Sequence, residues 1–272
     1  MIAEKSRLNR VFEEKKSAEK IMSLFITSGY PDLESTVELV LGMEKNGADI
    51  IELGMPFSDP LADGPTIQYA NNIAIENGIT LSKIFDMVKE IRKSSEIPIV
   101  LMGYINPIYR YGVEKFCADA EKAGVDGLII PDAPLEESSM IRDSVEKSNL
   151  SLIYLVAPNS TSERMKLIDK RSEGFVYCVS VTGVTGARDG DEIADSVLRF
   201  IDRVNANVTR NPRMVGFGIK SHKDAQRISA EMDGFIVGSA LIETIKEHYP
   251  NEGWKQKLYS FVKELKFGII SE

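Results

Sequence analysis

The feature that most constrains the fold is a regular alternation of short apolar runs with helical segments. Each run is rich in β-branched residues, and a turn rich in Gly, Pro or Asn follows it. A stretch with an apolar period of 3.6 residues comes next, so each unit predicts a strand followed by a helix. The eight runs lie near 22–26, 49–53, 98–103, 126–130, 152–156, 175–179, 214–218 and 234–237.

Strands that are apolar along their whole length are typical of a parallel sheet buried on both faces. Eight strand–helix units in about 250 residues match the size of a (β/α)8 barrel, the TIM barrel. A doubly wound open sheet is the alternative, but no G-x-G-x-x-G motif follows the first run. No linker or low-complexity tract interrupts the chain, so we predict a single TIM-barrel domain over residues 1–272. An extra N-terminal helix at 4–16 and a final amphipathic helix from Trp254 complete the prediction.

Composition and charge argue against several classes of function. The chain has 33 Lys and Arg against 41 Asp and Glu, a net charge of −8, which does not suit a nucleic-acid partner. No apolar run approaches the roughly 20 residues that span a bilayer, and no secretory signal opens the chain, so we expect a cytoplasmic protein. Cys117 and Cys178 lie in apolar stretches and are expected in the core. Neither histidine has a partner at metal-ligand spacing, so no metal site is expected.

A weak internal repeat draws attention to one carboxylate. Three segments, 45–53, 122–130 and 229–237, align on Asp49, Asp126 and Asp233. At the position where two of them have isoleucine, the first has Glu52. Burying an ionised carboxylate among apolar neighbours is costly without a partner. Desolvation would raise its pKa and suit it to proton transfer near neutral pH, and a buried ion pair with Lys or Arg is the alternative.

A second carboxylate is predicted at the same end of the barrel. Glu52 lies near the C-terminal end of its strand, where barrel enzymes carry catalytic groups. The long loop 54–65 follows, and Asp63 stands just before the next helix, so it should return over the barrel mouth. The aspartates of this loop could instead be turn formers. Two carboxylates in different environments can divide acid and base roles.

Three glycine-rich turns late in the chain predict a phosphate site. They lie at 180–187, 216–219 and 238–240, after the sixth, seventh and eighth runs. Glycines let backbone N–H groups approach an anion, and a helix N-terminus adds partial positive charge. Lys220, beyond these glycines, is interpreted as a surface lysine rather than a Schiff-base lysine. Tyr177 is expected to point either into the barrel or toward the helices.

The segment that holds Glu52 and Asp63 carries a family resemblance. Residues 52–65, Glu-Leu-Gly-Met-Pro-Phe-Ser-Asp-Pro-Leu-Ala-Asp-Gly-Pro, resemble the signature of the tryptophan synthase alpha chain family. Segments 24–32, 182–186 and 216–219 resemble three more of its motifs in the same order, so the resemblance covers essentially the whole chain. Met55 departs from the β-branched residue that is more usual there, which bears on the loop and not on chemistry.

The resemblance implies a lyase of tryptophan biosynthesis that cleaves indole-3-glycerol phosphate to indole and glyceraldehyde 3-phosphate in a retro-aldol step. By this resemblance Glu52 would be the acid and base at indole C3 and at the glycerol hydroxyl. Asp63 would hydrogen-bond the indole N–H. Tyr177 matches the pocket tyrosine of the family, and Phe25 and Leu128 match its apolar contacts to indole.

The resemblance also implies a phosphate site and a lid. Loop 180–190 would close over the site, with Thr185 reaching toward Asp63. The phosphate would lie on backbone groups at Gly186, Phe217, Gly218, Gly238 and Ser239.

A partner is implied as well: a beta chain that carries pyridoxal phosphate and receives indole in an alpha2beta2 heterotetramer, while this chain itself has no cofactor. Its docking surface would include Pro56, Asp59, Asn106, Pro107 and the loop that begins at Pro131 and Asp132.

Three other functions fit part of the pattern. A stand-alone lyase of the same fold would release indole at full rate without a beta chain. Another phosphate-binding barrel, such as an isomerase of a small sugar phosphate, would need a narrower pocket. A non-catalytic subunit that only activates a partner would not need Glu52 and Asp63, and both are present.

Overall fold

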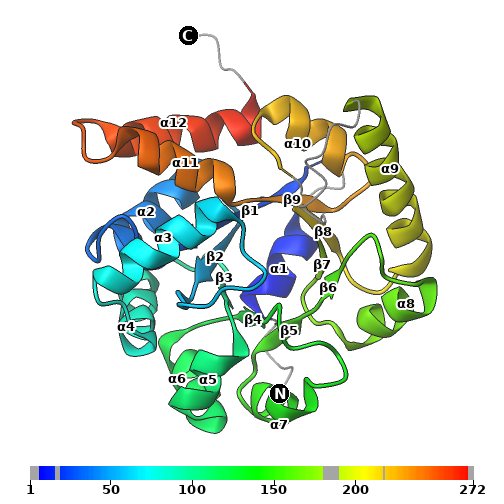
Figure 1. Ribbon diagram of the computed structural model, residues 1–272, viewed down its shortest axis with the longest axis horizontal. Helices are drawn as coiled ribbons and strands as arrows, with labels where there is room; N and C mark the ends of the chain where they lie inside the picture. The colour runs from blue at the N-terminus through cyan, green and yellow to red at the C-terminus, as the bar shows by residue number, and fades with distance from the viewer. Residues whose placement is uncertain (1–5, 16–18, 180–189, 217, 269–272) are drawn as a thin grey trace.

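The computed structural model describes residues 6–15, 19–179, 190–216 and 218–268, and its centre is a parallel sheet closed into a barrel (Figure 1). The strand order is β5-β4-β3-β2-β1-β9-β8-β7-β6, which confirms the predicted TIM barrel and not an open doubly wound sheet. The strands are β1 (Ile21–Thr27), β2 (Ile50–Gly54), β3 (Ile99–Met102), β4 (Gly127–Ile129), β5 (Ser151–Ile153), β6 (Leu155–Val156), β7 (Val176–Val179), β8 (Arg213–Gly216) and β9 (Gly234–Val237).

Helices surround the barrel in Figure 1. They are α1 (Arg7–Glu14), α2 (Ser35–Lys45), α3 (Pro65–Glu76), α4 (Leu81–Arg92), α5 (Ile105–Tyr111), α6 (Val113–Ala123), α7 (Ser139–Lys147), α8 (Ser162–Arg171), α9 (Gly190–Asn207), α10 (His222–Ser229), α11 (Ser239–His248) and α12 (Trp254–Phe267). None of these described helices is both long and apolar enough to cross a membrane.

The predicted strand 152–156 is divided in two at Tyr154. Its first half, β5, pairs with β4, and its second half, β6, pairs with β7, so this segment closes the barrel. The backbone N–H of Tyr154 donates to the hydroxyl of Ser172 at 3.0 Å and leaves the ladder. A side chain 18 residues away therefore causes the interruption, which the local sequence pattern does not reveal.

Two apolar layers follow from the alternation of side chains along the strands. The larger layer lies between the sheet and the helices and includes Cys117 and Cys178, which are both buried and unpaired, as predicted. The smaller layer fills the barrel interior. Leu8 of α1 is fully buried in that inner layer, so the extra N-terminal helix covers one end of the barrel. The final amphipathic helix is also confirmed, because α12 buries Leu258, Val262 and Leu265.

The internal repeat has a structural explanation at the start of the strands. In each of the three copies, the aspartate carboxylate accepts a hydrogen bond of 2.8 Å from a backbone N–H. The donor is the first or second residue of a neighbouring strand. The donors are Met22 for Asp49, Ile99 for Asp126 and Arg213 for Asp233. Each carboxylate also pairs with one or two cations. These are Lys15 and Lys266 for Asp49, Arg92 and Arg7 for Asp126, and Arg213 for Asp233. The repeat therefore marks a recurring bond between adjacent strands, while Glu52 lies three residues further along one of them.

The best buried of these aspartates gives a test of this explanation. Asp126 is 5% exposed and lies 2.7 Å from Arg92, and burial raises the pKa of Asp126 and lowers that of Arg92. Asp126→Asn keeps an acceptor for Ile99 but leaves the arginine without its counter-ion, so we expect the free energy of unfolding to fall by about 2 kcal/mol. Urea unfolding followed by circular dichroism measures this change. Glu90→Gln, which breaks an exposed pair with Lys93, is the control and should cost less than about 0.5 kcal/mol; equal losses would refute the explanation.

Candidate active site

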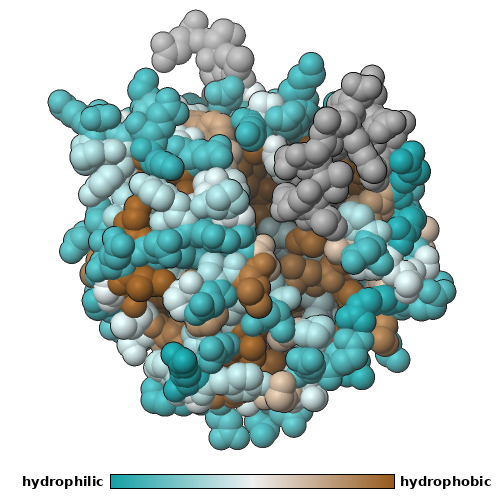
Figure 2. Space-filling view, viewed as in Figure 1, coloured by the Kyte–Doolittle hydropathy of each residue, from teal (hydrophilic) through white to brown (hydrophobic). Residues whose placement is uncertain are grey.

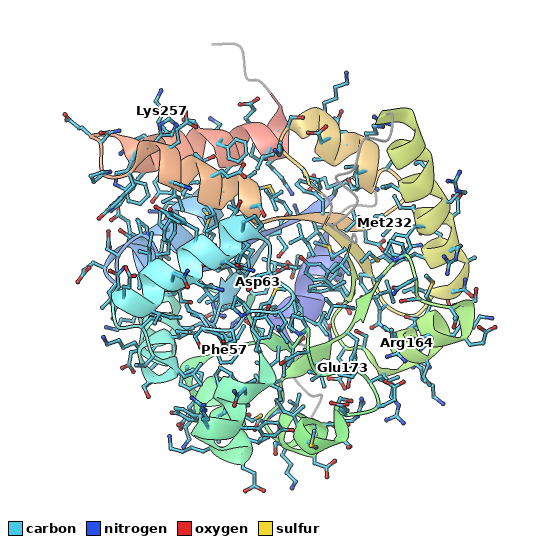
Figure 3. All side chains as sticks on the ribbon, in the orientation of Figure 1. Phe57, Asp63, Arg164, Glu173, Met232 and Lys257 are labelled. Carbon is cyan, nitrogen blue, oxygen red and sulfur yellow. The ribbon has the colours of Figure 1, made fainter. Side chains whose placement is uncertain are left out.

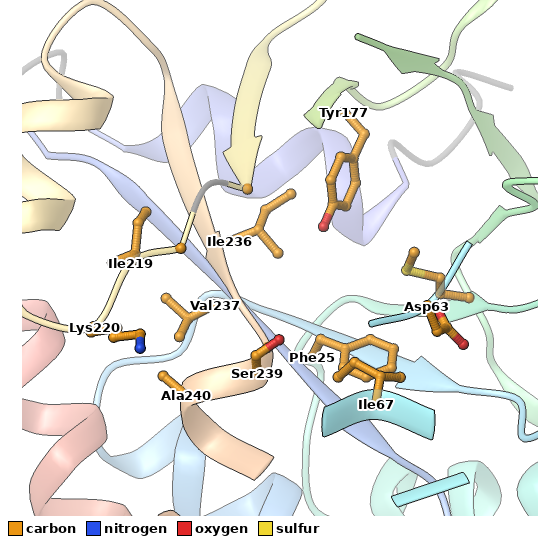
Figure 4. A pocket seen from close by; sticks show the side chains of 14 residues that line it. Phe25, Asp63, Ile67, Tyr177, Ile219, Lys220, Ile236, Val237, Ser239 and Ala240 are labelled. Atoms are coloured by element: carbon orange, nitrogen blue, oxygen red, sulfur yellow. The ribbon is translucent and has the colours of Figure 1, made fainter. Parts of the chain in front are cut away.

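A pocket opens at the C-terminal end of the barrel strands (Figure 4). Its described walls enclose about 210 Å³, and apolar surface is visible in the hollow at the centre of this face in Figure 2. The pocket is lined by Phe25, Asp63, Ile67, Met102, Tyr177, Gly216, Gly218, Ile219, Lys220, Ile236, Val237, Gly238, Ser239 and Ala240.

Glu52 lies fully buried on the inner side of β2, in register with Phe25 of β1 and Val100 of β3. Its Oε1 accepts a hydrogen bond from the Ser23 hydroxyl at 2.7 Å, and its buried Oε2 has no hydrogen-bond partner among the described residues. No lysine, arginine or histidine of the described residues pairs with it, so the alternative of a buried ion pair is wrong for this part of the chain. Burial raises the pKa of Glu52 to about 7, against the opposing effect of the Ser23 hydrogen bond. Such a group exchanges protons readily at neutral pH.

Asp63 lines the pocket from the loop that precedes α3, and Figure 3 shows it near the centre of the barrel mouth. Its Oδ2 accepts a hydrogen bond from the side-chain amide of Asn71 at 3.1 Å, and the Tyr104 hydroxyl donates a second one. Burial raises the pKa of Asp63, and these two hydrogen bonds oppose the rise. The predicted return of Asp63 over the mouth is confirmed.

Asn71 and Tyr104 were not among the predicted site residues. Asn71 is 4% exposed on α3, and Tyr104, 3% exposed, also accepts the backbone N–H of Ala62 at 2.9 Å. The one available signal was a pair of adjacent asparagines, Asn71 and Asn72, in an otherwise apolar helical stretch. A buried amide requires a hydrogen-bond partner, and Asp63 supplies it here.

Tyr177 faces the barrel interior and not the helices, which resolves the open alternative. Its hydroxyl lies close to Gly216. Any larger residue at position 216 would place its Cβ 2.9 Å from the hydroxyl oxygen of Tyr177. Gly216 therefore makes room for the tyrosine ring. Burial raises the pKa of Tyr177 well above its usual value, and the charge of Glu52 adds to the rise, so the two groups lie within electrostatic reach.

The end of the pocket near α11 suits an anion. Gly238 precedes this helix and Ser239 is its first residue, so the helix N-terminus borders the pocket, as Figure 4 shows. Backbone N–H groups in the first turn of a helix have no partner within it, and the helix dipole adds partial positive charge. Gly218 approaches from the loop after β8 with a positive φ of 41°. Lys220 is exposed, as interpreted, but its side chain lines this same end of the pocket and adds a cation.

One predicted contact is wrong. Leu128 is fully buried in the layer between the sheet and the helices, so its side chain cannot touch a ligand in the pocket. Its neighbour Ile129 lies in the inner layer, in register with the pocket residue Met102. The error is one residue along β4, and in a strand a shift of one residue moves the side chain to the opposite face. Phe25, the other predicted apolar contact, does line the pocket.

Three further predicted residues, Thr185, Gly186 and Phe217, lie outside the described residues. The lid over 180–190 and this part of the phosphate site therefore stay predictions. Within the described residues, no three His, Cys, Asp or Glu side chains come together as a metal site would require.

The residues predicted to form the partner surface follow three adjacent strands. Pro56 and Asp59 follow β2, Asn106 and Pro107 follow β3, and Asp132 follows β4. Asp132 Oδ1 accepts the backbone N–H of Ile105 at 2.9 Å, which joins the last two of these loops.

The segment 106–109 is part of helix α5. Ile108 is fully buried, whereas Tyr109 is 39% exposed and its hydroxyl lies 2.9 Å from the sulfur of the exposed Met140. Leu61, in the loop after β2, is 93% exposed. The described part of this chain therefore leaves the side chains of Leu61, Tyr109 and Met140 exposed.

Comparison with known proteins gives a consistent result. The family model described as tryptophan synthase alpha chain matches residues 12–269. The tryptophan synthase alpha chain of Geotalea uraniireducens is 46% identical over 254 residues, which cover 93% of this chain and 94% of that protein. That of Caldanaerobacter subterraneus subsp. tengcongensis is 45% identical over 262 residues, or 96% and 98% of the two chains.

Solved structures agree with the sequence matches. A tryptophan synthase alpha chain from Legionella pneumophila superposes with a TM-score of 0.87 at 36% identity and covers 98% of both chains. A tryptophan synthase from M. tuberculosis, in an open form, gives a TM-score of 0.85 at 34% identity, over 98% of this chain and 99% of that one.

Proposed function

The chain belongs to the tryptophan synthase alpha chain family, and we propose that it cleaves indole-3-glycerol phosphate to indole and glyceraldehyde 3-phosphate. The observation that carries this proposal is the buried carboxylate of Glu52, which has no counter-ion among the described residues and a pKa raised to about 7. It lies beside a pocket that has apolar walls, a second carboxylate and a helix N-terminus suited to an anion. These are the groups that the reaction requires.

In the proposed reaction, Glu52 gives its proton to C3 of the indole ring, which leaves the ring positively charged. The ionised Glu52 then takes the proton of the glycerol hydroxyl as the bond between C3 and the glycerol carbon breaks. The electron pair of that bond returns to the ring, and the hydroxyl carbon becomes the aldehyde of glyceraldehyde 3-phosphate. The pKa of about 7 favours both proton transfers, because a catalytic group works best near the operating pH.

Asp63 is proposed to accept a hydrogen bond from the indole N–H and to stabilise the positive charge that develops on the ring. Two donors, Asn71 and Tyr104, hold its carboxylate at the pocket wall. Phe25 and Tyr177 supply flat apolar surface for the ring. The phosphate is placed at the opposite end of the pocket, near Ser239 and Lys220, so carboxylates and cation orient the substrate from two sides.

We also propose that residues 1–272 act as one domain within a cytoplasmic alpha2beta2 complex. The beta chain would carry pyridoxal phosphate and receive indole, and this chain would hold no cofactor. Support comes from the exposed apolar side chains of Leu61, Tyr109 and Met140, near the loops after β2, β3 and β4. A partner that covers these loops would bury them.

The experiment that tests the function measures indole release from indole-3-glycerol phosphate by the purified chain, alone and with a tryptophan synthase beta chain. A slow rate that rises strongly when the beta chain is added supports the proposal. A fast rate that ignores the beta chain favours the stand-alone lyase. No release in either reaction refutes the proposed function and points to another phosphate-binding barrel.

The phosphate end gives a separate prediction. Ser239→Asp places a negative charge at the first residue of α11, where the substrate phosphate is expected, so KM should rise by roughly 10-fold or more. Ser239→Ala is the control, because it keeps the backbone N–H groups and should change KM by less than about 5-fold. Steady-state kinetics over a range of substrate concentrations distinguishes the two variants. An unchanged KM in Ser239→Asp would move the phosphate site elsewhere.

A further inference from the structure

The two oxygens of the Glu52 carboxylate have unequal surroundings. Oε1 accepts the Ser23 hydroxyl at 2.7 Å, and both side chains are fully buried. Oε2 is equally inaccessible, and no group in the part of the chain that the structure describes forms a hydrogen bond with it. Buried polar atoms normally have partners, so an unpartnered oxygen on the candidate catalytic group requires an explanation.

Ser23 is a polar residue in the first half of the apolar strand β1, where a larger or purely apolar side chain would fill the barrel as well. It pairs in register with Ile50 of β2 and Ile236 of β9, and both isoleucines belong to the inner layer. Its hydroxyl therefore lies inside the barrel, below the level of Glu52 and Phe25. From there it reaches one carboxylate oxygen and not the other.

We infer that Ser23 is a positioning residue that holds Oε1 of Glu52 as a fixed acceptor, so that Oε2 is the atom that takes and gives the proton. The chemical reason is that an oxygen already accepting a short hydrogen bond is the poorer site for a proton. The inference rests on the proposed function, because it assigns one atom of Glu52 to the proton transfers proposed above. It also explains why Oε2 lacks a partner within residues 6–15, 19–179, 190–216 and 218–268: the substrate would supply one.

The surroundings of Glu52 make Ser23 the group that stabilises its ionised form. Tyr177 of β7 faces it with a neutral phenol, Val100 of β3 and Phe25 of β1 are apolar, and Asp63 at the mouth is another acid. Within the described chain no cation lowers the pKa of Glu52, whereas the Ser23 hydrogen bond does. Loss of this hydroxyl should therefore raise the pKa of Glu52 further.

The test compares Ser23→Ala with the wild-type chain in its complex with a beta chain. The limb of the kcat/KM pH profile that reports Glu52 should move to higher pH by about one unit, because a hydrogen bond to a charged group is worth about one to two pKa units. Infrared spectroscopy of the protonated carboxyl group, assigned by its loss in Glu52→Gln, should show the same shift without any need for activity.

Two further variants separate positioning from general damage. Ser23→Thr keeps the hydroxyl and should bring the pH profile back toward the wild type. Ser229→Ala removes another fully buried hydroxyl, which donates to a backbone carbonyl in α10 far from the pocket, and should leave the profile in place. A pH limb and an infrared titration that do not move in Ser23→Ala, or that move equally in Ser229→Ala, would overturn the inference.

The two measurements also keep the inference distinct from the proposed function. If the infrared titration moves as expected but neither chain releases indole, the proposed reaction fails, and with it the substrate role of Oε2. If indole is released normally and neither measurement moves, the reaction stands and Ser23 has no positioning role.

Discussion

Glu52→Gln is expected to lower kcat for indole release by about 10²-fold to 10⁴-fold, the contribution of a well-placed acid and base. The amide keeps the shape of the side chain and can still accept the Ser23 hydrogen bond, but it cannot exchange a proton with the substrate. Substrate binding should persist, because the pocket groups proposed to hold the ring and the phosphate, among them Asp63 and Ser239, are unchanged in this variant. Single-turnover kinetics together with a direct binding measurement separates the two effects.

The control for this variant is Glu90→Gln, which neutralises an exposed carboxylate far from the pocket and should leave kcat unchanged. Retention of more than about a tenth of the wild-type rate in Glu52→Gln would mean that the acid and base lies elsewhere.

Although Glu52→Gln should lower kcat, it should raise the free energy of unfolding, and the size of this rise should depend on pH. The pKa of Glu52 is about 7 in the folded chain against 4.5 as its ordinary value, so the folded state holds a proton that the unfolded state has lost between these pH values. The contribution of protonated Glu52 to the free energy of unfolding of the wild type is therefore complete below pH 4.5, and it is lost as the pH rises through 7. Glu52→Gln should gain up to about 3 kcal/mol over the wild type at pH 8, and the gain should be absent at pH 4. Urea unfolding at the two pH values measures the difference.

The sequence predicted the elements of the site better than their contacts. Glu52 and Asp63 were found because a carboxylate in an apolar strand, and another before a helix, are local features of the chain. Ser23 was not found, because its hydrogen bond joins residues 29 positions apart. Asn71 and Tyr104 were missed for a related reason, since their role depends on where a loop folds back.

The sequence also did not show toward which face of the sheet each side chain of a strand points. The family resemblance assigned the apolar contact from β4 to Leu128, whereas its neighbour Ile129 is the residue that faces the barrel interior. Apolar residues on both faces of a buried parallel strand remove the alternation that would have decided this. Lys220 is a similar case in a loop. The sequence indicated an exposed lysine but not that its side chain also lines the pocket.

Asp63→Asn is expected to lower kcat by about 10²-fold or more, although the two side chains have almost the same size. The variant loses the negative charge that is proposed to stabilise the positive indole ring. It also loses an acceptor. In the aspartate, Oδ2 accepts the amide of Asn71, and the remaining acceptor capacity serves Tyr104 and would serve the proposed indole N–H.

Asparagine has a single side-chain oxygen, so its NH₂ group must face either the donors Asn71 and Tyr104 or the indole N–H. Either arrangement sets a donor against a donor. Because the charge acts mainly on the transition state, kcat should fall more than KM rises. Asn71→Ala is the companion variant: it leaves the charge in place but removes one of the two donors that hold it, so its loss of kcat should be smaller. A rise in KM at constant kcat in Asp63→Asn would restrict Asp63 to uniform substrate binding, and the charge that stabilises the ring would then have to come from Glu52 alone.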